Sequence, residues 1–418
     1  MDRLIHHDAR ILTLASDGHG PRRGRAMRGL GVIERGYIVS ERGRIAAIGA
    51  GDAPPLAGTR RDMRGRVVMP AFVDCHTHAL HAGERYGETA KRLAGVPYLE
   101  ILAAGGGIMS TVRATREAMR GAPAGAGLRD ELDARLDAMR RAGTLAVEVK
   151  SGYGLDRDTE LAMLDTIHAA ARRRAEGGTG FVTPTFLGAH AIDGDEDRFC
   201  AHIVDEVLPE AVRRFGPIPC DAYCEKGAWS PAWTRRLFER AKALGCPLRV
   251  HVDQFNELGF LDTALELGAR SVDHLEATSR DALVRVAKSP TTAVLLPGCG
   301  LTLDGRYANG RALVDAGASV AIATNCNPGS SPLVSMPLVI ALAARFCGLD
   351  HEEAIVAATY NAACVLGLER ETGSLEVGKR AHLVELPTRD ERALAYEWGA
   401  AAPSAVFDGS TQWPLECP

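Results

Sequence analysis

Short β-like runs alternate with amphipathic stretches through the middle of this chain, and no other feature restricts its folding as strongly. The helical patterns cover residues 130–142, 161–176 and 233–244. Such an alternation predicts a parallel sheet with crossover helices. The β-like runs are eight in number: 67–78, 144–150, 181–190, 220–225, 247–253, 270–276, 292–297 and 319–325. Eight β–α units predict a (β/α)8 TIM-type barrel, whose functional residues lie at the C-terminal ends of the strands.

The two ends of the chain follow a different pattern, with short alternating strands and Gly-rich turns. A chain of 418 residues is long for one compact domain and suits a large barrel plus a smaller unit. We therefore predict an α/β architecture. Its barrel spans residues 67–373, and its small β-sandwich domain combines residues 1–66 with residues 374–418.

Composition and charge exclude several classes of partner. A net charge of −4 and a pI near 6.4 argue against binding to nucleic acid or to an acidic membrane surface. No apolar stretch reaches the ~20 residues that span a bilayer, and the first residues lack a signal-peptide core. Ten cysteines without framework spacing predict reduced thiols and a cytoplasmic location.

Histidines at the ends of three predicted strands indicate a metal site. His76 and His78 end the first strand, and residues two apart on a strand point to the same face. His251 ends the fifth strand and His274 the sixth. Each histidine taken alone is ordinarily structural. Together at one end of a barrel they predict a catalytic site for one divalent metal, zinc or iron, with a water in an open position.

The end of the eighth strand departs from what this chemistry needs. A metal-activated water must lose a proton, and a carboxylate at this position is its natural acceptor. The sequence instead has Asn325. An amide oxygen can approach a metal but cannot take the proton, and loss of a general base costs about 10²–10⁴ in rate.

Eight segments of the chain form a more specific pattern than the histidines alone. The segments are Asp-Cys-His-Thr-His at 74–78, His-Ala-Gly-Glu-Arg at 81–85, Ala-Gly-Gly-Gly-Ile-Met-Ser-Thr-Val at 104–112, Val-Glu-Val-Lys-Ser-Gly-Tyr-Gly at 147–154, Phe-Leu-Gly-Ala-His at 186–190, Tyr-Cys-Glu-Lys-Gly-Ala at 223–228, His-Val-Asp-Gln at 251–254 and Asp-His-Leu-Glu at 273–276. Together they resemble the segments of imidazolonepropionases, the amidohydrolase-superfamily enzymes of histidine breakdown. The Gly-Gly-Gly and Lys-Ser-Gly-Tyr-Gly segments are the most specific, whereas many metal hydrolases share His-x-His.

The resemblance implies the opening of a five-membered lactam ring, in which 4-imidazolone-5-propionate and water give N-formimidoyl-glutamate. It implies one zinc or iron ion held by His76, His78, His251 and Asn325. By analogy a small anionic heterocycle is the substrate, and the chain forms a homodimer.

The resemblance also assigns the residues around the substrate. It implies that Arg85 faces the propionate carboxylate, with Tyr153 and His190 also in contact with the substrate. Gln254 and His274 are expected to orient the water and the ring carbonyl. Asn327 and Gly329 are expected to line the carboxylate end.

Chemistry supports these roles only in part. Arg is the favoured bidentate partner of a carboxylate, which suits Arg85. The alternatives are a solvated arginine for Arg85, a loop-packing aromatic for Tyr153, a core histidine for His190 and a surface amide for Gln254. Lys150 is compatible with a carbamylated bridge between two metals, although one metal in the family makes an ion-pair role the expected one.

Two further departures concern the loop after strand seven and the returning β segment. Residues 296–304 replace an aromatic-rich family segment, so the substrate could be a thio-substituted or hydantoin-like relative. Cys299 in this loop either contacts the substrate or fills buried space. His382 stands where the superfamily usually has Asp, and we expect it to be a surface packing residue.

The presence of Asn325 is compatible with several interpretations of the function of this chain. It can be an engineered change that traps substrate, which the otherwise intact site favours, or a natural variant with another proton acceptor such as His274. A catalytically silent ligand-binding homologue is the third reading. A heterocycle aminohydrolase is the other enzyme class, but it usually needs a carboxylic acid near the strand-five histidine, where this chain has Gln254.

Overall fold

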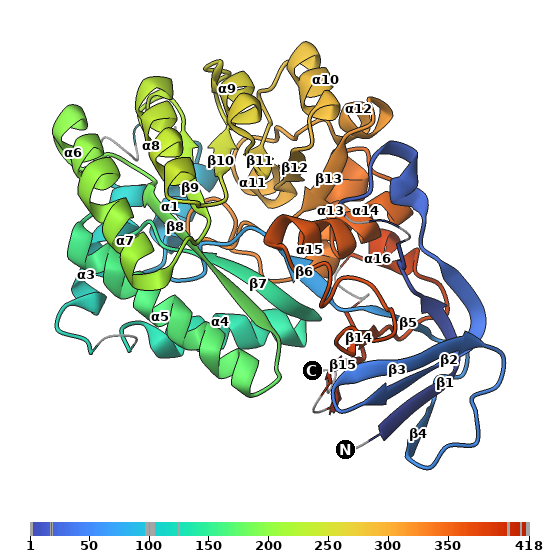
Figure 1. Ribbon diagram of the computed structural model, residues 1–418. Coiled ribbons are helices and arrows are strands. Elements are labelled where there is room, and N and C mark those ends of the chain that lie inside the picture. The colour runs from blue at the N-terminus through green and yellow to red at the C-terminus, as the bar shows by residue number, and fades with distance from the viewer. Residues whose placement is uncertain are drawn as a thin grey trace.

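Two eight-stranded sheets organise the part of the chain that the computed structural model describes (Figure 1). That part comprises residues 3–16, 18, 20–96, 100, 105–123, 126–398, 402–409 and, by backbone alone, 412–414. Ala104, in the Gly-rich segment at 104–112, lies outside it. Within it no helix is long and apolar enough to cross a membrane.

The central sheet is a parallel barrel whose edge strands meet. Its strands run in chain order: β6 (Phe72–Asp74), β7 (Thr144–Lys150), β8 (Phe181–Ala189), β9 (Cys220–Cys224), β10 (Arg249–Val252), β11 (Ser271–His274), β12 (Thr292–Leu295) and β13 (Ser319–Ile322). A parallel bridge joins Thr77 to Cys326, and the Asn325 amide donates to the His76 carbonyl at 3.0 Å. The predicted (β/α)8 barrel is confirmed, and its closure brings the end of the first strand beside the end of the eighth.

The first predicted strand, 67–78, was wrong as a single barrel element. Residues 67–70 form β5 (Val67–Pro70), which pairs with the chain-end sheet, and only β6 belongs to the barrel. The whole run is buried, so hydrophobicity does not reveal that the chain passes from one sheet into the other. The chain-end sheet therefore extends four residues beyond the boundary expected at residue 66.

Helices lie along the outside of the barrel (Figure 1). Side-chain caps explain several of their starts: Asp156 accepts from the Thr159 amide before α5, and Asp350 and Glu353 form a reciprocal capping box at α14. The helices are α1 (Tyr86–Leu93), α3 (Ile108–Met119), α4 (Arg129–Arg141), α5 (Arg157–Glu176), α6 (Glu196–His202), α7 (Leu208–Phe215), α8 (Pro231–Ala243), α9 (Phe260–Leu267), α10 (Arg280–Lys288), α11 (Pro297–Thr302), α12 (Gly310–Asp315), α13 (Met336–Phe346), α14 (His351–Ala357), α15 (Tyr360–Leu366) and α16 (Ala393–Tyr396). A 3-10 turn (Gly24–Arg28) and a π-helical turn (Ile203–Val207) are the other helical elements whose bounds fall within the described residues.

The second sheet joins both ends of the chain. It is mixed and contains β1 (Arg3–Leu12), β2 (Val32–Glu41), β3 (Arg44–Ala50), β4 (Thr59–Asp62), β5, β14 (His382–Glu385), β15 (Ala405–Asp408) and β16 (Gln412–Pro414). β14 pairs with β5, so the returning segment lies directly beside the entry to the barrel. His382 is buried in β14 rather than exposed, because its strand is enclosed on both faces, and the surface-packing prediction was wrong.

Candidate functional site

Four histidines gather at the C-terminal end of the barrel. Ligand-capable atoms of His76, His251 and His274 lie within 4.8 Å of one another, and all three side chains are buried. His78 approaches the same group, with its Nε2 3.1 Å from His251 Nε2. Two imidazole nitrogens that bind one tetrahedral zinc at its usual bond length lie about 3.3 Å apart. The spacing of this pair therefore fits a shared cation.

Unpartnered buried atoms mark the same place. His76 Nε2, His78 Nδ1 and Asn325 Oδ1 are buried and have no hydrogen-bond partner among the described residues. Buried polar atoms are ordinarily paired, because leaving one without a partner costs free energy. Two of them, His76 Nε2 and Asn325 Oδ1, are therefore available as metal ligands, whereas His78 Nδ1 lies on the side of its ring opposite the Nε2 that faces His251.

Carboxylates fix the rings of two of these histidines. Asp273 Oδ2 lies 2.5 Å from His76 Nδ1, and Asp221 Oδ1 lies 3.1 Å from His251 Nδ1. A carboxylate on one imidazole nitrogen orients the ring and presents the other nitrogen to a metal. Sequence reasoning missed both aspartates, although Asp273 directly precedes His274.

A buried ion network supports the carboxylates in turn. Lys150 Nζ contacts Glu148 and Asp221, each at 2.7 Å, and Arg249 contacts Glu148 and, at 2.8 Å, Asp273. All five side chains are at most 1% exposed. Burial alone would raise the pKa of Asp221, but His251 and Lys150 lower it well below its usual range. The ion-pair prediction for Lys150 is confirmed, and its amine is not free to bridge two metals as a carbamate.

The backbone is strained where the strands end at the site. Asp253, His274, Leu275 and Asn325 have φ values of 55°, 87°, 71° and 51°. Non-glycine residues rarely adopt the left-handed region, and each such residue costs about 1–3 kcal/mol. Strain of this kind persists where the surrounding structure imposes it, which is typical of functional sites.

Tyr153 and His190 pack against the histidine cluster. The His190 ring stacks on His78 at 4.8 Å between centroids, and the Tyr153 ring lies 5.1 Å from His190. His190 Nδ1 is 2.9 Å from the Gly152 carbonyl, so this nitrogen carries the proton and donates it. Burial lowers the pKa of His190 to about 3, which keeps the imidazole neutral.

Glu160 holds the glycine-rich loop that carries Tyr153. Its buried carboxylate accepts from the amides of Gly152, Gly154 and Leu155 at 2.8–3.1 Å. Gly152 has φ 106° and would place a Cβ only 2.8 Å from the Leu187 carbonyl, so the loop requires glycine there. Sequence analysis did not single out Glu160, because a carboxylate in the first turn of a helix is common.

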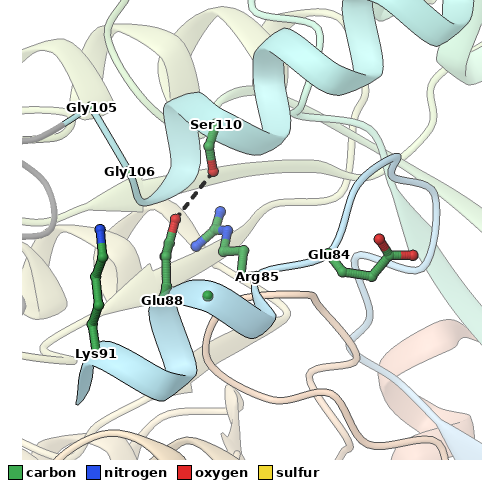
Figure 2. A pocket seen from close by; sticks show the side chains of 8 residues that line it. Glu84, Arg85, Glu88, Lys91, Gly105, Gly106 and Ser110 are labelled. Atoms are coloured by element: carbon green, nitrogen blue, oxygen red, sulfur yellow. Dashed lines mark hydrogen bonds between the residues drawn. The ribbon is translucent and has the colours of Figure 1, made fainter. Parts of the chain in front are cut away.

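Arg85 lies against the loop after β13. Its Nε donates to Thr111 Oγ1 at 3.0 Å, and a Cβ on Gly329 would sit 2.1 Å from its Nη1. Gly329 therefore makes room for the guanidinium. Arg85 also lines a cleft of about 330 Å³ beside α1, in which Glu88 lies between Arg85 and Lys91 (Figure 2). Arg85 is the residue that this cleft shares with the predicted substrate set.

Asn327 and Gln254 are engaged by other protein groups. Asn327 Oδ1 accepts from the Gly329 and Ser330 amides, and its Nδ2 donates to the Asn325 carbonyl at 2.7 Å. It thus closes the turn after β13. Gln254, buried rather than on the surface, accepts from the Tyr223 hydroxyl at 2.9 Å.

Cys299, Glu276 and His274 form a second set of donors within 4.8 Å of one another. Glu276 Oε1 is 3.1 Å from His274 Nδ1, and Cys299 Sγ accepts from Asn325 Nδ2 at 2.9 Å. His274 Nδ1, Glu276 Oε1 and Cys299 Sγ each take part in a hydrogen bond, whereas Glu276 Oε2 has no partner among the described residues. Burial raises the pKa of the Cys299 thiol well above its usual value, so it is not a reactive thiolate.

The family model and the most similar relatives that the comparisons found agree on one protein family. Residues 227–409 match the model of the amidohydrolase family. The chain is 43% identical over 418 residues to the imidazolonepropionase of Rubrobacter xylanophilus, covering 96% of each chain. It is 41% identical over 413 residues to that of Herpetosiphon aurantiacus, covering 95% of this chain and 94% of the relative.

Solved structures share the fold at low sequence identity. A 5-methylcytosine deaminase from Klebsiella pneumoniae, liganded with 5-fluorocytosine, has a TM-score of 0.71 at 16% identity and covers 100% of this chain and 98% of its own. A Xaa-Pro dipeptidase with methionine in its active site has a TM-score of 0.69 at 14% identity, covering 99% and 100%. These likenesses support the barrel architecture.

Replacing Lys150 with Met tests the ion network. The substitution leaves Asp221 without the cation that it contacts and leaves Glu148 with Arg249 alone, and breaking a buried pair costs about 3–5 kcal/mol. We expect urea denaturation of the metal-stripped protein to show a loss of this size. Arg235→Met on the exposed surface of α8 is the control and should leave the midpoint unchanged. A Lys150→Met midpoint equal to wild type would contradict the role of the network.

The buried neutral histidines predict a loss of stability in acid. Because burial lowers the pKa of His190 from about 6.5 unfolded to about 3 folded, the unfolded chain binds the extra proton. Stability is full above about pH 6.5 and falls as the pH drops, by about 1.4 kcal/mol per pH unit for each such group. His190→Asn should reduce the slope of unfolding free energy between pH 6 and 4 by one proton. An unchanged slope in metal-stripped protein would refute this assignment.

Proposed function

The chain belongs to the imidazolonepropionase family of amidohydrolases, and we propose that it hydrolyses 4-imidazolone-5-propionate to N-formimidoyl-glutamate. The observation that carries the proposal is the cluster of buried imidazoles with unpartnered atoms, set inside a match that spans nearly the whole chain. In the reaction the lactam C–N bond breaks, water oxygen joins the ring carbonyl carbon, and the ring nitrogen gains a proton.

We assign the metal ligands to His76, His78, His251 and Asn325. Neutral imidazoles suit zinc or iron, and burial lowers the pKa of His76 and of His78 well below the usual value. A bound divalent ion would polarise the ring carbonyl and lower the pKa of a water. The unpartnered Asn325 Oδ1 is an acceptor available to the same ion.

The proton that Asn325 cannot accept passes to His274 in this proposal. Glu276 Oε1 lies 3.1 Å from His274 Nδ1, so a proton on Nδ1 is donated to the carboxylate and Nε2 keeps its lone pair. A neutral imidazole backed by a carboxylate is the arrangement in which histidine acts as a general base. The second oxygen of Glu276 is buried without a partner among the described residues, which leaves it able to stabilise the resulting imidazolium.

The remaining residues bind the ligand in this proposal. Arg85 carries the positive charge that a propionate carboxylate requires, and its guanidinium lies against Gly329 in the loop after β13. Tyr153 and His190 supply aromatic faces for the ring. The Tyr223–Gln254 pair lies beside His251, with the Tyr223 ring 5.8 Å away, and offers polar contacts to the ring amide.

Binding without turnover is the second candidate function. It is favoured by one observation, namely that the residue at the end of β13 is an amide with no capacity to take a proton. In that case the site would hold the heterocycle and leave its lactam intact.

Asn325→Asp separates the two candidates. Both forms are loaded with zinc, and ring opening of freshly made 4-imidazolone-5-propionate is followed by loss of ultraviolet absorbance. We expect slow turnover by the wild type and a rise in kcat of about 10²–10⁴ in the Asp form, because a carboxylate restores the stronger base. Turnover by the Asp form alone would support binding without catalysis. If neither form turns over, the proposed function is wrong.

Arg85→Gln tests the carboxylate contact. A hydrogen bond to a charged group contributes about 1.5–3 kcal/mol, so KM should rise about 10–100-fold with a smaller change in kcat. The matched measurement uses the substrate analogue whose propionate is replaced by propionamide. The substitution should scarcely affect this neutral analogue. Equal losses on both substrates would mean that Arg85 does not bind the carboxylate.

A further inference from the structure

Cys299 and Asn325, which both depart from the family pattern, lie 26 residues apart in the sequence and are in contact in the structure. Asn325 Nδ2 donates a hydrogen bond to Cys299 Sγ at 2.9 Å, and each residue is 2% exposed. We propose that Cys299 is a positioning residue, which orients the Asn325 amide so that its oxygen and not its nitrogen faces the metal site. The inference rests on the proposed role of Asn325 as a metal ligand.

An amide needs this orientation, whereas a carboxylate does not. One end of the asparagine amide accepts hydrogen bonds and the other end only donates them. Rotation by half a turn about the last side-chain bond would present N–H groups to a cation. The two oxygens of an aspartate are both acceptors, so either orientation would serve.

Several contacts already fix the backbone of Asn325. Its backbone amide donates to the His76 carbonyl at 3.0 Å, and its own carbonyl accepts from Asn327 Nδ2 at 2.7 Å. Its φ of 51° holds the backbone in the left-handed region. With the backbone held in this way, a hydrogen-bond partner for Nδ2 favours one of the two amide orientations over the other.

Cys299 is well placed to make that choice. It lies in the first turn of α11, where its amide donates to the Leu296 carbonyl at 3.0 Å, and Ser330 Oγ is 4.0 Å from its sulfur. With Nδ2 bound to the sulfur, Asn325 Oδ1 is left without a partner among the described residues. The available acceptor is therefore the atom that a divalent cation would take.

The test is a double-mutant cycle on zinc affinity. Wild type, Cys299→Ala, Asn325→Asp and the double variant are stripped of metal and titrated with zinc against a chromophoric chelator. We expect Cys299→Ala to weaken zinc binding about 10-fold, the lower end of the usual effect of residues that orient metal ligands. In the Asn325→Asp background the same substitution should change the affinity less than about threefold, because a carboxylate needs no orientation.

Cys299→Ser should restore most of the affinity, because its hydroxyl also accepts from Nδ2. Cys246→Ala, at a buried cysteine between α8 and β10, is the matched control and should bind zinc as the wild type does. Thermal unfolding of each metal-stripped variant checks that the fold is retained. If Cys299→Ala does not fold, Cys299→Val replaces it, because valine fills similar space and accepts no hydrogen bond.

Equal loss of affinity in both backgrounds would show a general packing role and overturn the inference, as would no loss in either. Both results leave the proposed function standing. A wild type that binds no zinc or iron would overturn the proposed function and the inference together.

Discussion

The buried ion network beneath the histidines is the constraint on which the rest of the site depends. Lys150 and Arg249 compensate Glu148, Asp221 and Asp273 in a region that water does not reach. Charges at such depth are tolerated only when they are paired. The two aspartates in turn fix His76 and His251, so ring orientation follows from charge pairing inside the barrel. Rings that are already oriented by such contacts have less freedom to lose when a ligand binds, which reduces the cost of ordering them.

Closure of the barrel supplies the remaining geometry. The two strands whose ends carry His76, His78 and Asn325 are the first and the last of the barrel. Two backbone hydrogen bonds hold these ends together: the Asn325 amide donates to the His76 carbonyl, and the His78 amide donates to the Cys326 carbonyl. Left-handed backbone at His274 and Asn325 then accompanies their placement at the site, at a cost that the packed barrel offsets. Topology thus joins residues that are about 250 positions apart.

Much of this arrangement was predictable from sequence, for identifiable reasons. Alternating β and α patterns fix a barrel, and His-x-His after a buried run fixes where its site lies. The passage from β5 into β6 was not predictable, because an apolar run looks the same in either sheet. Asp221, Asp273 and Glu160 escaped notice for a similar reason, since carboxylates are common and only their three-dimensional partners distinguish them. The contact between Asn325 and Cys299 depends on folding that brings α11 beside the end of β13.

The hydrogen bond between Asn325 and Cys299 also changes how these two differences from the family pattern are interpreted. Taken separately, an amide in place of a carboxylate is a loss, and a cysteine in a loop is a small apolar filler. Taken together they form a donor–acceptor pair that leaves the Asn325 oxygen without a partner among the described residues, and in the proposed function that oxygen is a metal ligand. The pair does not supply a general base, because an asparagine amide cannot take a proton from water. In the proposed function, ligation and proton transfer, which one carboxylate could perform together, are divided between Asn325 and the His274–Glu276 pair. The two tasks become separable by mutation in this chain.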